Sequence, residues 1–326
     1  PMLRGSGVAQ DMRMLGYGAY GDLDFKPVVE PGGDCYARCK VRVRELFTLA
    51  GDITHVDLRN LLENGGREEL QRTKNTQLAV TLASRSAHVR LTELGHVFTT
   101  HSGFSLGELS AYAGSGIISD ETLFELVAIR AALMEQEAQR IQAALGEVGM
   151  AAVIGLPYDA VSELIKDRND VYAANDNSPV QVVISGTLKA IEEVQERLKE
   201  HGARRIIPLR VSGPFHTPLM EGAIPCFEAA IGSLPFHDPR ELVISSVTGM
   251  PVTSATQAKR TLITQLSKPV RWTKAVNTIT SVKDSDSIVG EVGHGEILAK
   301  LVQDRLSVLP LGSEERIRAF HKGIKQ

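Results

Sequence analysis

The sequence is poor in cysteine, in aromatic residues and in long apolar segments. Its 326 residues include three cysteines and one tryptophan, and the aromatic residues together make up 5%. A small, odd number of cysteines does not form a disulfide framework, so we expect a reducing, cytoplasmic location. No apolar run approaches the roughly 20 residues that span a bilayer. The amino-terminal segment also lacks the basic, apolar and small-residue order of a secretory signal. We therefore expect neither a membrane segment nor a secretory signal.

The charged residues do not indicate a nucleic-acid partner, and the cysteines do not indicate a metal site. The net charge is −3, and no basic stripe of the kind that binds nucleic acid is present. Cys35 and Cys39 lie one helical turn apart, but no cluster of histidines or acids accompanies them. We therefore expect no bound metal. Hydrophobic residues make up 43% and charged residues 23%, which is the balance of an ordinary soluble globular protein.

The apolar pattern changes twice along the chain. Residues from about 36 to 100 show helical spacing, and Ser119 can cap a further helix that begins beside it. The stretch from 138 to 211 predicts the order βαββαβ of a ferredoxin-like unit. Its expected strands cover 148–154, 170–174, 180–185 and 204–211, and its helices cover 159–166 and 188–201.

The remaining pattern indicates a larger α/β domain around this unit. It predicts strands at 241–246 and 287–292 and helices at 255–266 and 272–279, whereas the glycine-rich first 34 residues offer one strand-like piece at 25–29. We expect an α/β-hydrolase-like domain with a mostly parallel sheet, formed by residues 1–137 and 212–326. The ferredoxin-like subdomain, 138–211, would be inserted into it.

A G-x-S-x-G pattern, residues 103–107, is the first candidate for chemistry. It lies between a weakly alternating segment and a helical one. On a sharp strand-to-helix turn such a pattern exposes its serine, here Ser105, and the amide of Leu106 can face a developing oxyanion. Turns rich in small residues also occur without function, so the pattern needs partners elsewhere in the chain.

A serine hydroxyl needs a base that accepts its proton, and the chain has nine histidines. His101 lies four residues before Ser105, but we interpret it as a polar residue at a strand end. The other histidines lie in polar, exposed segments or, for His294, at a glycine turn. His216 differs because Pro214 and Pro218 stiffen the chain on either side of it. An ordinary loop histidine remains the alternative.

Arg130 is the third candidate, because it interrupts an apolar helical run from 126 to 134. A guanidinium near a core must pair with an acid or bind the anion of a ligand. Glu125 or Glu135 could supply a structural ion pair, so the sequence alone leaves both interpretations open.

Taken in order, these segments resemble the malonyl-CoA:acyl-carrier-protein transacylases and the related acyltransferase domains of fatty-acid and polyketide synthesis. The likeness runs from about residue 36 to about 310. It rests on the segments 103–108, 130–134, 174–186, 214–220, 245–249, 269–272 and 291–293. Two departures stand out. The P-G-Q-G loop of the family has its nearest match in Pro31-Gly32-Gly33, without the glutamine, and Phe104 replaces the histidine that most members carry.

The resemblance implies a role for each candidate. Ser105 would be the nucleophile that becomes acylated, and His216 would be its base. Arg130 would clamp the free carboxylate of malonyl, and the backbone carbonyl of Gln265 would orient the imidazole. Leu106 would supply an oxyanion donor, and Phe215 would contact the substrate.

The implied activity moves malonyl from coenzyme A to the phosphopantetheine thiol of an acyl carrier protein by a ping-pong reaction. Coenzyme A enters as the thioester substrate, and no other cofactor is expected. We expect a monomer that docks its acidic carrier through a basic patch, with Arg204, Arg205, Arg210 and Arg271 as candidates. The alternatives are the transferase component of a malonate decarboxylase, a serine hydrolase of acyl thioesters, and an inactive interaction module.

Overall fold

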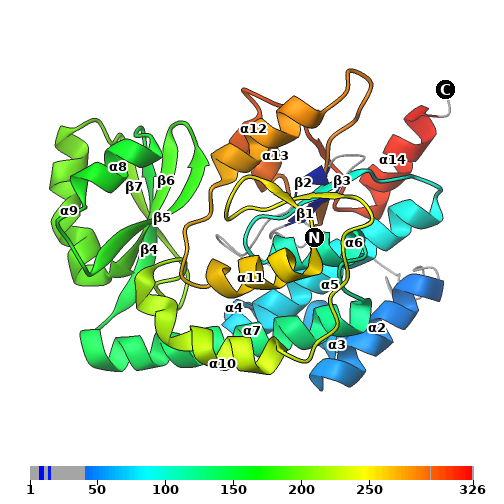
Figure 1. The fold of residues 1–326 in the computed structure, drawn as a ribbon, viewed down its shortest axis with the longest axis horizontal. Coiled ribbons are helices and arrows are strands. Elements are labelled where there is room, and N and C mark those ends of the chain that lie inside the picture. The colour runs from blue at the N-terminus through cyan, green and yellow to red at the C-terminus, as the bar shows by residue number, and fades with distance from the viewer. Residues whose placement is uncertain (1–6, 11–13, 16–40, 294, 325–326) are drawn as a thin grey trace.

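The computed structural model describes residues 7–10, 14–15, 41–293 and 295–324 (Figure 1). Five features considered above lie outside these residues: the strand-like piece at 25–29, the Pro31-Gly32-Gly33 segment, Cys35, Cys39 and His294. Within the described part of the chain, no helix is long and apolar enough to cross a membrane.

Between residues 41 and 145 the structure has six helices and one short strand. The helices α2 (Val41–Thr54), α3 (Leu58–Asn64), α4 (Arg67–Gln71) and α5 (Thr73–Glu93) confirm the helical pattern predicted for this region. The strand β3 (Thr100–Ser102) then leads to α6 (Gly107–Gly114) and α7 (Asp120–Leu145). The Ser119 hydroxyl caps α7 by accepting from the amide of Thr122, as predicted.

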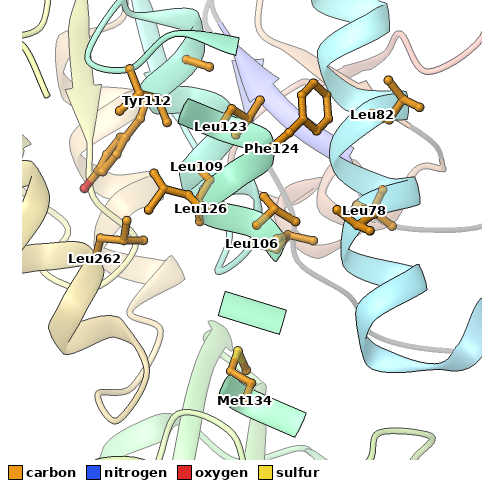
Figure 2. Packing of buried hydrophobic residues seen from close by; sticks show 14 of the residues in the cluster. Leu78, Leu82, Leu106, Leu109, Tyr112, Leu123, Phe124, Leu126, Met134 and Leu262 are labelled. Carbon is orange, nitrogen blue, oxygen red and sulfur yellow. The ribbon is translucent and has the colours of Figure 1, made fainter. Parts of the chain in front are cut away.

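In the core of this part, α6 packs against both α5 and α7, which also pack against each other. Leu106 and Leu109 at the start of α6 pack near Leu78 of α5 and Phe124 of α7, and all four side chains are buried (Figure 2). Burial of a leucine or phenylalanine side chain contributes about 1.5–3 kcal/mol. This packing fixes the amino-terminal end of α6, which is where the candidate serine lies.

The main sheet has the strand order β11-β10-β1-β3-β8-β9, with β2 also beside β3. Its strands are β1 (Gly7–Gln10), β2 (Met14–Leu15), β8 (Leu242–Ile244), β9 (Pro251–Val252), β10 (Gly290–Gly293), β11 (Leu309–Pro310) and β3. Three pairs are parallel, β10–β11, β2–β3 and β3–β8, and three are antiparallel, β1–β10, β1–β3 and β8–β9.

The expectation of a mostly parallel sheet was therefore wrong, because the described sheet is mixed. Two of the antiparallel pairs involve β1, from the glycine-rich region whose apolar pattern has no clear period. The third is a short hairpin in which Gly249, at φ 72°, turns the chain from β8 into β9. A strand of two residues leaves no period-2 signal in the sequence.

The second part has its own four-stranded antiparallel sheet in the order β5-β6-β4-β7. Its elements follow one another as β4 (Val148–Ile154), α8 (Tyr158–Leu164), β5 (Val171–Ser178), β6 (Gln181–Thr187), α9 (Leu188–Glu200) and β7 (Arg205–Leu209). This is the predicted βαββαβ order, with boundaries close to those expected. Both helices lie on one side of the sheet, at one end of the molecule (Figure 1).

The chain then returns to the larger part. The elements here are η1 (Pro218–Ala223), α10 (Ile224–Ile231), α11 (Ala255–Gln265), α12 (Trp272–Val282), α13 (Ile297–Val302) and α14 (Glu314–Ile324). A backbone bridge joins the two parts where Asn175 of β5 lies beside Val270. There the amide of Asp176 donates to the Val270 carbonyl at 2.8 Å, so the end of β5 is fixed against the segment that precedes α12.

Candidate active site

Ser105 lies on a tight turn between β3 and α6. Its backbone is in the left-handed region, at φ 50°, where a residue with a side chain is strained. Gly103 makes the turn possible, since a Cβ at this position would lie 2.0 Å from the carbonyl carbon of Gly107. The predicted strand–turn–helix geometry of the G-x-S-x-G segment is confirmed.

His216 comes from a segment more than a hundred residues away and meets the serine directly. Its Nε2 lies 2.7 Å from the Ser105 Oγ, and its Nδ1 lies 3.0 Å from the backbone carbonyl oxygen of Gln265. A carbonyl only accepts, so Nδ1 carries the ring proton and Nε2 is the acceptor that faces the hydroxyl. The His216 ring therefore lies between the Ser105 hydroxyl and the Gln265 carbonyl, and its role as the base stays a prediction.

His216 is also held in a left-handed backbone conformation, at φ 61°. Among the described residues only three non-glycine residues have positive φ, and Ser105 and His216 are two of them. Strain of this kind persists where the surrounding structure imposes it, and it concentrates at functional sites. The shared strain makes this pair the candidate reactive centre.

The electrostatic environment keeps the imidazole neutral. Burial, followed by the positive charge of Arg130, lowers the pKa of His216 to about 4, against a smaller opposing effect of the hydrogen bond to Gln265. Desolvation disfavours the charged form of a buried histidine. At neutral pH the ring is therefore unprotonated and able to accept the serine proton.

Arg130 lies on α7 with its guanidinium beside the nucleophile, although only 2% of the residue is exposed. Its Nη2 donates to the Ser105 Oγ and to the Gln265 side-chain Oε1, both at 3.2 Å. Its Nη1 donates to the Gln77 Oε1 at 2.7 Å. These three acceptors are uncharged oxygens, whereas Glu125, one of the acids considered for an ion pair, is exposed. The guanidinium is thus a cation next to the reactive hydroxyl.

Leu106 and Phe215 flank this centre. Leu106 is the N-cap residue of α6, and its side chain is buried in the core. Phe215 is half-buried and packs against both the main core and a small apolar cluster on the four-stranded sheet. Leu106 as an oxyanion donor and Phe215 as a substrate contact remain predictions.

Comparisons with known proteins match most of the chain. The family model described as "Acyl transferase domain" matches residues 48–323. The malonyl CoA-acyl carrier protein transacylase of Bacillus subtilis is 32% identical over 290 residues, which cover 87% of this chain and 89% of the relative. The transacylase of Haemophilus influenzae is 32% identical over 284 residues and covers 86% of this chain.

Solved structures give the same result for the fold. The malonyl CoA-acyl carrier protein transacylase of Coxiella burnetii superimposes with a TM-score of 0.82 at 29% identity, over 89% of this chain and 92% of that one. A malonyl-transacylase in complex with a type II polyketide-synthase acyl-carrier protein has a TM-score of 0.80 at 31% identity and covers 88% of this chain. The chain belongs to the malonyl-CoA:acyl-carrier-protein transacylase family.

Two buried polar residues of this transacylase-family chain were missed by the sequence reasoning. Gln77 of α5 accepts from Arg130, and Glu108 of α6 accepts from the Nε2 of Gln265 at 2.9 Å. Glu108 stands in an otherwise small or apolar helix, which is the signal that singled out Arg130. Gln77 has no such signal, because it becomes notable only once its partner is known.

Other candidates are placed away from the serine hydroxyl or are already engaged. His101 is fully buried on β3, with its ring 5.9 Å from that of His88. The interpretation of His88 as exposed was wrong, because α5 buries that face against the core. Arg271 stacks 4.0 Å from the Tyr158 ring centroid, whereas Arg204 and Arg205 are exposed at the edge strand β7.

No group of three or more histidines, cysteines and acids within the described ranges is arranged to hold a metal ion. The side chains in contact with the Ser105 hydroxyl are the imidazole of His216 and the guanidinium of Arg130.

Proposed function

We propose that this chain transfers malonyl from coenzyme A to the phosphopantetheine thiol of an acyl carrier protein, with Ser105 as the acylated residue. One observation carries the assignment. The Ser105 Oγ lies 2.7 Å from the His216 Nε2 and 3.2 Å from the Arg130 Nη2. A nucleophile, its base and a buried cation therefore meet at a single atom.

In the first half-reaction the neutral His216 accepts the hydroxyl proton as the Ser105 Oγ attacks the thioester carbonyl. The C–S bond then breaks, and the imidazolium returns the proton to the departing thiolate of coenzyme A. The amide of Leu106, at the amino-terminal end of α6, is proposed to donate to the oxyanion. In the second half-reaction the carrier thiol loses its proton to His216 as its sulfur attacks the carbonyl carbon of the acyl-serine. The C–O bond to Ser105 then breaks, and the imidazolium returns the proton to the Ser105 oxygen.

Arg130 supplies the selectivity for a carboxylated acyl group. A guanidinium can bind a carboxylate through two parallel hydrogen bonds. Acetyl offers no anion, so with acetyl the buried charge would gain no partner from the substrate. Because Arg130 Nη2 also contacts the Ser105 Oγ, binding of the malonyl carboxylate would place the thioester carbonyl close to the nucleophile.

We propose the domain division expected from the sequence: a discontinuous α/β-hydrolase-like domain, 1–137 and 212–326, and a ferredoxin-like subdomain, 138–211. The four-stranded sheet with its own apolar cluster supports it, although α7 continues to Leu145 and crosses the boundary. We also propose a monomer in a reducing cytoplasm, which agrees with the exposed free thiol of Cys226.

Radiolabelled malonyl-CoA tests the function directly. Label should be retained on the protein, map to Ser105, and move to a holo acyl carrier protein on its addition. Ser105→Ala should retain none. Rapid release of free malonate without a carrier would instead indicate a hydrolase, and failure of the wild-type protein to take up label would indicate an inactive relative.

A further inference from the structure

Gln265 joins all three residues of the proposed site, by its side chain as well as by its backbone. The backbone carbonyl accepts from the His216 Nδ1 at 3.0 Å. The side-chain Oε1 accepts from the Arg130 Nη2 at 3.2 Å, and the Nε2 donates to the backbone carbonyl of Ser105 at 3.1 Å. The residue is fully buried. Its side-chain amide therefore has a defined direction relative to the nucleophile and the cation.

Glu108 lies behind this amide, and it is also fully buried. Its Oε2 accepts from the Gln265 Nε2 at 2.9 Å and from the Ser246 hydroxyl at 2.7 Å, and its Oε1 accepts from the Tyr112 hydroxyl at 3.3 Å. Burial raises the pKa of the Glu108 carboxyl above its usual value, against the smaller lowering effects of the hydrogen bonds from Ser246 and Gln265. The carboxyl is thus surrounded by donors, with the amide of Gln265 among them.

The chemistry of the two groups fixes which way the amide points. A carboxylate only accepts, whereas an amide has one donating and one accepting end. The Nε2 of Gln265 must face Glu108 and the Ser105 carbonyl, and its Oε1 is then left to face Arg130. In the flipped amide, the NH₂ group would meet a guanidinium and the oxygen would meet a carboxylate. Both contacts would be repulsive.

We propose that Glu108 is a positioning residue that sets the direction of the Gln265 amide and, through it, the orientation of the Arg130 guanidinium. The inference rests on the proposed malonyl transfer. Glu108 contacts Gln265, and the neutral Oε1 of Gln265 makes the contact to Arg130. The guanidinium is thereby held in place beside the Ser105 hydroxyl.

The test compares two acyl donors in the full chain carrying Glu108→Gln. This change keeps the size of the side chain but gives it a donor, so that the Gln265 amide is no longer forced into one direction. The second-order rate constant for acylation of Ser105 by malonyl-CoA should fall roughly tenfold or more, the scale of a lost hydrogen bond to a charged group. The rate constant with acetyl-CoA should change by less than about threefold, since acetyl does not use Arg130.

Glu291→Gln is the matched control. Glu291 is also fully buried, but its carboxyl accepts from the amides of Leu298 and Ala299 at the start of α13. The control should leave the ratio of malonyl to acetyl rate constants unchanged. Gln265→Met is a second test, because it keeps the backbone carbonyl and removes both ends of the amide. It should lower the same ratio, and it decides the matter if Glu108→Gln does not fold.

Equal losses for both donors in Glu108→Gln, or an unchanged ratio in either test variant, would overturn the positioning role while leaving the transfer reaction intact. Absence of acylation of the wild-type chain by malonyl-CoA would instead overturn the proposed function itself. The two failures are therefore distinguishable in one set of assays.

Discussion

The Nδ1 of His216 lies 3.0 Å from the backbone carbonyl oxygen of Gln265, so an uncharged acceptor orients the base. A carboxylate in this position would stabilise the imidazolium strongly and raise its pKa. The carbonyl has a smaller effect, and burial together with Arg130 lowers the pKa of His216 to about 4. The site thus favours the neutral imidazole, which is the form that can accept the serine proton at the start of acyl transfer.

Replacing the base should slow acylation far more than it changes binding. His216→Ala removes the acceptor of the Ser105 proton, and general-base catalysis contributes typically 10²–10⁴-fold. Stopped-flow measurement of acylation by malonyl-CoA should show a loss in this range. His237→Ala is a control at another histidine. A loss below about tenfold in His216→Ala would assign the base to another group.

Removing the guanidinium should change the preference between acyl groups. Arg130→Ala takes away the cation that lies 3.2 Å from the Ser105 Oγ. We expect the rate constant for malonyl-CoA to fall by about 10- to 100-fold, the scale of a charge-assisted hydrogen bond, while that for acetyl-CoA stays level or rises. Competition between the two donors, followed by mass spectrometry of the acyl-enzyme, measures the ratio. An unchanged ratio would contradict the clamp.

The lowered pKa of His216 also predicts an acid-dependent stability. An unfolded histidine has a pKa of about 6.5, whereas the folded value is about 4. Between these values the unfolded chain binds more protons, so the contribution is present above about pH 6.5 and is lost as pH falls towards 4. Protonation linked to His216 alone should lower the free energy of unfolding by about 2 kcal/mol between pH 7 and pH 5.

Urea unfolding at the two pH values measures this contribution when wild type is compared with His216→Asn. Asparagine tolerates the left-handed backbone that is found here at φ 61°. The variant should lose less stability on acidification than wild type, and the difference should approach the value above. Parallel curves for the two proteins would mean that His216 does not remain neutral in the folded state.

The sequence predicted the four-stranded unit well because each element carries a strong local signal. The amphipathic helix α9 (Leu188–Glu200) and the buried strand β4 (Val148–Ile154) were placed with the correct type and nearly the correct bounds. The main sheet was predicted less well. Its pairing directions depend on contacts between short strands far apart in the chain, and β9 has two residues.

The site shows a similar division. The sequence could propose three of the site residues because each has a recognisable local pattern. Ser105 lies in a turn of small residues, His216 lies between two prolines, and Arg130 is a charge within an apolar run. Their meeting at one oxygen is a property of the fold. The direction of the Gln265 side-chain amide could not be predicted from the sequence. It depends on contacts with Arg130, Ser105 and Glu108, which come together only in the folded chain.

The turn that carries the nucleophile should not tolerate a side chain at Gly103. A Cβ there would lie 2.0 Å from the Gly107 carbonyl carbon and 2.1 Å from the Glu108 amide nitrogen. Because both obstacles are backbone atoms at the start of α6, Gly103→Ala must displace that helix. Overpacking of this kind costs typically about 1–3 kcal/mol or more. The free energy of unfolding should fall accordingly, and acylation should fall with it because Ser105 moves.

Gly66→Ala is the control, since a Cβ at that position meets no atom within 4 Å, and it should leave both quantities nearly unchanged. If Gly103→Ala were acylated as fast as the wild-type protein, Gly103 would not set the position of Ser105.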